Sequence, residues 1–141
     1  MYTPHTVTLI IAEETDDGMA YNSVILSGVF LDLSKRSNVN KSGLADADRA
    51  TLYIPLSIST DAQYVTPKAY SALESKSGYW TIFDGGESSS SECYFIKGAV
   101  ENAAISYAEA QRTYDFVYRV TSVDLRDFGR TQMQHWMVGG R

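Results

Sequence analysis

The stretch that decides the fold class is YNSVILSGVFLDL, residues Tyr21–Leu33. It is long and rich in Val, Ile and Phe, which favour the pleated, half-buried surface of a β-sheet. Gly28 stands in the middle of this run, where a glycine commonly marks a bulge or a bend. We therefore expect one long strand that bends at Gly28, as a strand does at the corner of a barrel.

Six further stretches have the alternation, or the β-branched and aromatic content, of strands. They are His5–Ile11, Ala50–Ile58, 79–83, 93–100, Phe116–Phe128 and 133–139. Because Pro55 lacks a backbone N–H, the strand that contains it is expected at an edge or a bulge.

Two stretches are typical of short helices. One is Thr66–Gly78, with Thr66 as N-cap and Pro67 in the first helical position, and the other is 105–115. Strands and helices do not alternate strictly, which disfavours a doubly wound parallel sheet. The sequence predicts a mainly β fold, a small antiparallel β-barrel or sandwich of about seven strands with one or two short helices and a long loop between early strands.

The length of 141 residues fits a single domain, 1–141, with one hydrophobic core. Within it we expect a loop at 34–49, a flexible linker at 84–92 and a C-terminal tail at 133–141.

Charge and cysteine content exclude several classes of protein. The net charge of -5 argues against attraction of the whole molecule to nucleic acid or to an anionic membrane. A single cysteine excludes an intramolecular disulfide and a multi-cysteine zinc site. The sequence has no signal peptide pattern and no apolar run near the ~20 residues that cross a bilayer. We expect a soluble protein, made in the cytoplasm, with no membrane partner.

The residues that usually carry chemistry do not form a catalytic motif. His5 and His135 belong to no metal-spaced cluster, and Cys93 lies in an apolar strand pattern where a buried thiol is inert. Asp124 and Asp127 are three apart on an expected strand, so they point to opposite faces. We expect no enzymatic activity, no bound metal and no cofactor.

The loop SKRSNVNKSGLADAD, residues Ser34–Asp48, carries Lys35, Arg36 and Lys41 in an otherwise acidic chain. Two interpretations stay open: a solvated crossover between strands, or a segment that a partner orders. Three neighbouring cations can meet phosphates within a Debye length of about 8 Å, even on an acidic protein.

Four segments carry a resemblance over nearly the whole chain: HTVTL at 5–9, the stretch 26–55 around NVNKSG, KAYSALESKSGYWTI at 68–82, and 120–141 around MQHW. They resemble a family of small uncharacterised proteins encoded in head-tail gene clusters of tailed phages and prophages of Firmicutes. The segment 84–100 departs from this likeness, because similar proteins are shorter and more regular there.

The resemblance implies a virion component of the head-tail connector, similar to head-completion (stopper) proteins, which are small barrels assembled as rings beneath the portal. It implies four kinds of partner: other copies of the chain, portal or adaptor proteins, tail proteins and packaged DNA. In stopper-like folds a long loop between early strands projects into the channel. The matching residues expected to face DNA are Lys35, Arg36, Asn38, Lys41 and Ser42.

The C-terminal MQHWMVGGR, 133–141, is expected to contribute a subunit interface through His135, Trp136 and Met137. A ring uses two different patches per subunit, and a large aromatic residue near flexible glycines suits an anchor. The alternative that Trp136 is an ordinary core residue of the last strand stays open.

The nearest alternative function is an adaptor or tail terminator of the same module. A nucleic-acid-binding barrel is an alternative of another class, which would need a basic groove with interleaved aromatic residues. An enzyme ranks third.

Overall fold

The computed structural model of the chain describes residues 3–34, 49–58, 60, 62–83, 91–101 and 105–141. Its elements, in chain order, are β1 (His5–Thr15), β2 (Gly18–Ser34), β3 (Arg49–Pro55), β4 (Gln63–Tyr64), α1 (Pro67–Ser71), β5 (Tyr79–Trp80), β6 (Ser91–Lys97), α2 (Tyr107–Thr113), β7 (Val117–Arg126), the 3₁₀ turn η1 (Thr131–Met133) and β8 (His135–Gly140).

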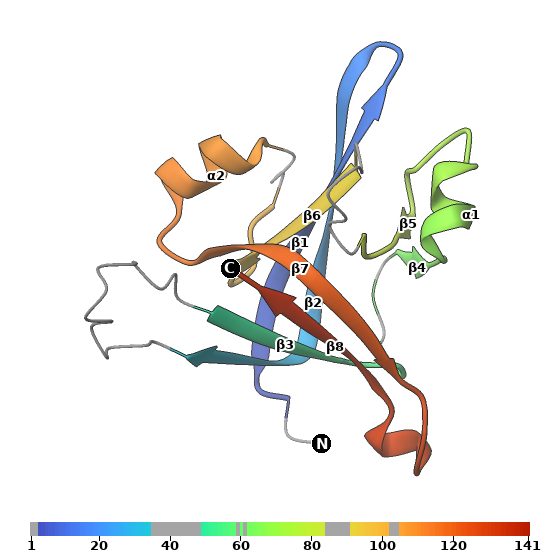
Figure 1. The fold of residues 1–141 in the computed structure, drawn as a ribbon, viewed down its shortest axis with the longest axis vertical. Coiled ribbons are helices and arrows are strands. Elements are labelled where there is room, and N and C mark those ends of the chain that lie inside the picture. The colour runs from blue at the N-terminus through green and yellow to red at the C-terminus, as the bar shows by residue number, and fades with distance from the viewer. Residues whose placement is uncertain (1–2, 35–48, 59, 61, 84–90, 102–104) are drawn as a thin grey trace, which may run out of the picture.

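Six strands form a closed antiparallel barrel in the order β1-β2-β3-β8-β7-β6, with β6 pairing back onto β1 (Figure 1). The remaining two, β4 and β5, are only two residues long and form a small parallel sheet of their own. The mainly β barrel expected from the sequence is confirmed.

Gly28 makes a corner of the barrel. The β1–β2 register passes from His5 opposite Val29 to Thr6 opposite Ser27, so Gly28 is an extra residue in the ladder. Its φ of 85° lies in the left-handed region, which glycine adopts without the steric penalty of a Cβ. β2 pairs with β1 before this corner and with β3 after it, which confirms the bend expected at Gly28.

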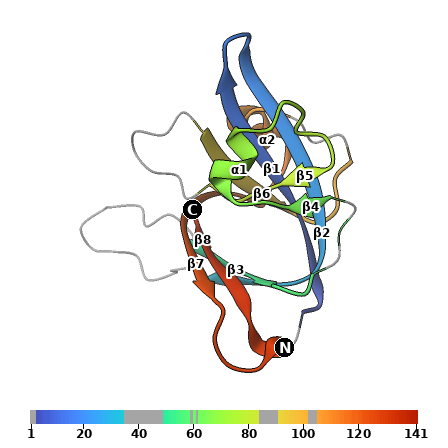
Figure 2. The same cartoon turned by 90° about the vertical axis from the view of Figure 1, so that its right-hand side faces the viewer.

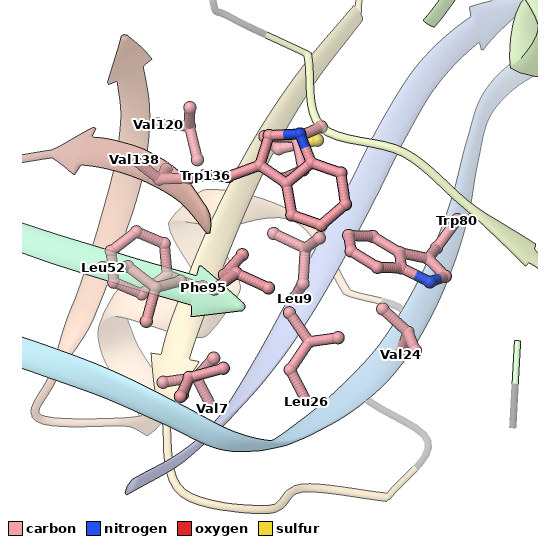
Figure 3. Packing of buried hydrophobic residues seen from close by; sticks show 14 of the residues in the cluster. Val7, Leu9, Val24, Leu26, Leu52, Trp80, Phe95, Val120, Trp136 and Val138 are labelled. Atoms are coloured by element: carbon pink, nitrogen blue, oxygen red, sulfur yellow. The ribbon is translucent and has the colours of Figure 1, made fainter. Parts of the chain in front are cut away.

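The barrel interior is filled by the inward-facing residues of all six strands, such as Val7, Leu9, Leu26, Leu52 and Phe95 (Figure 3). These side chains are at most 1 % exposed. Burying each aliphatic or aromatic side chain of this size contributes about 1.5–3 kcal/mol, which makes this cluster the main source of stability.

The segment between β3 and β6 closes one end of the barrel. In Figure 2, α1, β4 and β5 lie across that end, and Tyr70, Trp80, Ile82 and Phe83 join the barrel core. The Nδ2 atom of Asn22 on β2 holds the segment in place by donating to the carbonyl of Tyr79 at 2.9 Å.

The helix expected over Thr66–Gly78 has the expected N-cap, because Thr66 Oγ1 accepts from the backbone N–H of Ala69. It ends much earlier than expected, at Ser71. The Lys76 ammonium folds back and donates to the carbonyl of Leu73 at 2.9 Å and to that of Tyr70. The Lys76 side chain thus supplies hydrogen-bond donors to carbonyls at the helix end, which would otherwise need the N–H groups of a further helical turn.

The position of β3 in the barrel differs from the sequence-based expectation. The strand is not at an edge, because it pairs with both β2 and β8. Pro55 is tolerated because it is the last residue of β3, and the pairing with β2 already stops at Tyr53. The missing N–H of the proline therefore removes no bond from the β2–β3 ladder.

A second, smaller cluster lies on the outside of β1 and β6, where Ile10, Ala12, Tyr94 and Ile96 pack with Ala110 of α2. Helix α2 therefore covers one outer face of the barrel. Among the described elements, no helix lies over the outward side of β3 and β8 (Figure 1). This side, together with the parts of β2 and β7 that pair with it, is called the open face below.

Candidate functional site

The loop residues expected to face DNA, Lys35, Arg36, Asn38, Lys41 and Ser42, lie outside the described residues. Of the expected linker 84–92, residues 84–90 also lie outside the described residues. Its last two residues, Ser91 and Glu92, are the first two of β6. The role expected for the loop remains a prediction.

The C-terminal segment is a barrel strand. Residues His135–Gly140 form β8, which pairs with β3 on one side and with β7 on the other. Trp136 is 9 % exposed, and its ring centroid lies 4.6 Å from that of Tyr64 and 5.9 Å from that of Trp80. Trp136 is therefore a core residue, which corrects the expectation of an interface anchor: strand alternation turns the indole into the barrel.

His135 and Met137 have the opposite orientation and lie half-buried on the open face. The Nδ1–H of His135 donates to the carbonyl of Met133 at 2.8 Å, and Nη2 of Arg126 lies 3.8 Å from the Met137 sulfur. These two residues remain accessible enough to take part in a contact, and their role in a subunit interface stays a prediction.

A row of aromatic side chains crosses the outside of four neighbouring strands. The ring centroids are 5.5 Å apart between His5 and Phe30, 5.7 Å between Phe30 and Tyr53, and 5.5 Å between Tyr53 and His135. The two histidines that the sequence leaves isolated near the two ends of the chain are thus the two ends of one row. Sequence alternation marks each ring as outward-facing, but only the strand order brings them together.

A groove of about 440 Å³ lies in the open face beside this row. Gly139 of β8 forms part of the groove floor, and because glycine has no side chain the groove stays unfilled at this position. A Cβ at this position would lie 2.5 Å from Oγ of Ser122. The groove is lined by Arg49, Ala50, Thr51, Thr121, Ser122, Asp124, Met137, Gly139, Gly140 and Arg141.

The groove lining mixes polar and apolar surface, with hydroxyls along its walls and charged side chains from Arg49, Asp124 and Arg141. Thr51 and Ser122 flank Gly139, because Thr51 pairs with Gly139 on one side and Ser122 on the other. Asp124 belongs to the next row along the strands, opposite Met137. Such a lining offers hydroxyls, a carboxylate and guanidinium groups to a polar or charged ligand. It contains no histidine, cysteine or lysine.

The only thiol is not poised for chemistry. Cys93 is fully buried, and burial raises its pKa to about 12, although the backbone N–H of Phe83 donates to the sulfur at 3.2 Å. The neighbouring Tyr94 hydroxyl donates to the carbonyl of Ile105, and burial raises its pKa as well. Cys93 is the inert core thiol that its apolar strand context predicts.

Within the ranges that the structure describes, no cluster of three or more His, Cys, Asp or Glu side chains is arranged to hold a metal ion. None of the helices in those ranges is long and apolar enough to span a membrane.

The fold and these surfaces define a small closed β-barrel protein with one sheet face left open. Residues 2–141 match the model of a family of unknown function, DUF6751, and the chain belongs to this family. Neither the curated proteins nor the solved structures contain a match to the chain.

Proposed function

We propose that this protein is a structural component of a tailed-phage head-tail connector, namely the head-completion or stopper protein that forms a ring under the portal and helps to retain DNA in the virion. The phage context rests on the sequence resemblance described above. An assembly role has support from the surface of the subunit.

The observation that carries the assembly role is the hairpin between β7 and β8. Leu125, Phe128 and Met133 are 53 %, 68 % and 53 % exposed, and they all lie on this hairpin or at its base. Large apolar side chains gathered on a projecting hairpin mark a protein contact site more often than a solvated surface. The hairpin between β1 and β2 projects from the opposite end of the molecule (Figures 1 and 2).

The two hairpins differ in chemistry, as the two halves of a heterologous ring contact must. The tip of the β1–β2 hairpin holds four acidic residues, Glu13 and Glu14 near the end of β1 and Asp16 and Asp17 in the turn. The β7–β8 hairpin offers apolar side chains with Arg126 and Arg130 among its charges. A subunit with distinct contact surfaces at its two ends supports a ring protein better than a symmetric dimer.

The test compares the variant Phe128→Ser/Met133→Ser with Met19→Ser, which removes an exposed methionine from the other hairpin. Both variants should remain folded because the replaced side chains lie outside the core. We expect the double variant to be lost from purified particles and Met19→Ser to be retained. Normal incorporation of the double variant, or absence of the wild-type protein from particles, would refute the proposal.

The alternatives within the same module are an adaptor and a tail terminator. Electron microscopy of the assembled particle separates them by the position of the ring, directly under the portal-adaptor for a stopper and at the end of the tail tube for a terminator. The nucleic-acid-binding barrel is the alternative of a different class, and it requires nucleic-acid binding without incorporation into particles.

A further inference from the structure

Three arginines lie side by side at one end of the open face. Ala50 pairs with Gly140 at the end of the β3–β8 ladder, Arg49 and Arg141 are the next residues along the two segments, and both line the groove. On the other side, the backbones of Arg141 and Arg119 exchange two hydrogen bonds of 2.8 and 3.0 Å. Arg49 belongs to β3, Arg119 to β7, and Arg141 directly follows β8, so the three come from distant parts of the sequence.

The charge of Arg119 is compensated within the chain. Its Nε lies 3.2 Å from a carboxylate oxygen of Glu92, and its guanidinium stacks 4.2 Å above the Tyr107 ring. Helix α2, which carries Tyr107, and strand β6, which carries Glu92, thus draw this arginine towards the covered side of the barrel.

Arg49 and Arg141 have no such compensation among the residues that the structure describes. Neither guanidinium forms an ion pair with any residue in the described ranges, and both line the groove. Like charges that lie close together on neighbouring strands repel each other. An anion held between the two guanidiniums would remove that repulsion, so this end of the groove has the electrostatics of an anion site.

The rest of the groove limits where an anion can bind. The hydroxyls of Thr51 and Ser122 are available as donors beside the glycine floor, and Asp124 lies further along and repels a second anion. The favourable position is therefore the arginine end. Planar guanidinium groups match phosphate oxygens in geometry, and each such contact is a charge-assisted hydrogen bond.

We propose that Arg49 and Arg141 form a phosphate-binding site at the end of this groove, and that the phosphate belongs to the backbone of a nucleic-acid strand. The groove is open along the sheet, which suits a polymer, and the half-buried Tyr53 and Phe30 rings lie on the same face for contact with bases. The proposed site uses none of the loop residues Lys35, Arg36 and Lys41, and it can be tested on the isolated chain whether or not the chain assembles into a ring.

The experiment measures binding of a short fluorescent oligothymidylate by anisotropy, with inorganic phosphate and polyglutamate as competitors. The wild type is compared with Arg49→Gln/Arg141→Gln and with the matched control Arg112→Gln, an exposed arginine on α2. We expect the double variant to bind about tenfold more weakly or worse, the loss that corresponds to about 1.4 kcal/mol, and the control to bind normally. Loss of two phosphate contacts should also reduce the slope of log affinity against log salt by about 1.4.

A thermal melt of each variant accompanies the binding assay, so that loss of binding is not confused with loss of the fold. Inorganic phosphate should raise the melting temperature of the wild type and not that of the double variant. Equal oligonucleotide binding by the wild type and the double variant would overturn the site. Displacement by polyglutamate as effective as by phosphate would overturn the phosphate assignment, and binding of free phosphate without any binding of the oligonucleotide would overturn its nucleic-acid source.

Discussion

The Nδ1 atom of His5 accepts a hydrogen bond from the backbone N–H of Leu31 at 3.0 Å. The bond lies next to the Gly28 bulge, where the β1–β2 ladder is interrupted and the β2 backbone turns towards β3. A side chain thus replaces a backbone acceptor at the barrel corner, and an imidazole that accepts at Nδ1 carries its proton on Nε2.

His5→Ala should lower the free energy of unfolding by about 1–3 kcal/mol, because the Leu31 N–H then lacks its acceptor. His5→Asn provides an oxygen acceptor at a similar position and loses the same stacking on Phe30, so it should recover part of this loss. Urea denaturation of both variants measures the difference. Equal stabilities would mean that the histidine acts at this corner through stacking alone.

Gly28→Ala should destabilise the barrel by about 1–2 kcal/mol through backbone strain, since the residue has a φ of 85°. No atom lies within 4 Å of the added Cβ, so a steric clash does not contribute. Gly28→Asn should be milder, because asparagine tolerates left-handed conformations better than alanine. If both substitutions lower the unfolding free energy equally in denaturant titrations, backbone strain at the bulge is not the cause of the destabilisation.

Trp136→Ala should lower the unfolding free energy by about 3–5 kcal/mol, as expected for an aromatic side chain removed from a core. Met137→Ala, the neighbouring position on the open face, should have a clearly smaller effect because its side chain is only half-buried. Thermal and chemical unfolding of both variants test this contrast. A Trp136→Ala protein with wild-type stability would place the indole outside the core.

The stability of the protein should decrease above about pH 9 in part because of Cys93. Burial raises the pKa of this thiol from 9.0 to about 12, so the folded state keeps the proton while the unfolded state releases it. The contribution is fully present below pH 9 and is lost as the pH rises towards 12. Cys93→Ala should therefore show a shallower loss of unfolding free energy over this range than the wild type.

The same thiol should resist Ellman's reagent near pH 8 in the native protein and react fully in denaturant, since it is fully buried. Rapid modification of the native protein would contradict the buried, protonated state.

Replacing Lys35, Arg36 and Lys41 by serine should leave the barrel folded, because the three residues lie between β2 and β3 and outside both strands. If the loop faces DNA in the particle, such particles should release their genomes after packaging, which sedimentation and DNA quantification detect. Replacement of Lys68 on α1 is a matched control for loss of positive charge elsewhere. Full DNA retention by the triple variant at raised salt would leave the loop as a linker.

The barrel strands could be predicted because their residues alternate, and the corner at Gly28 because a glycine interrupts a β-branched run. The end of α1 could not, since it depends on Lys76 reaching back to Leu73, a contact that helix propensity does not encode. The two-residue strands β4 and β5 are too short to have a periodicity.

The open face was not predictable for a different reason. Arg49 and Arg141 become neighbours only when β8 inserts between β3 and β7, and the aromatic row requires the same strand order. A single sequence shows which side chains point outward but not which strands are adjacent. The same lack of strand order left Trp136 undecided between the core and a subunit contact, until the pairing of β8 on both sides placed it inside.

The position of β8 also has a consequence for synthesis on the ribosome. β8 is the last barrel strand along the chain, yet it lies between β3 and β7 and joins their otherwise unpaired edges. Until residues 135–140 leave the exit tunnel, a nascent chain has two open edges that can pair with other chains. The barrel therefore closes only after translation has reached its last strand, and a chain truncated before His135 is expected to aggregate or to be degraded.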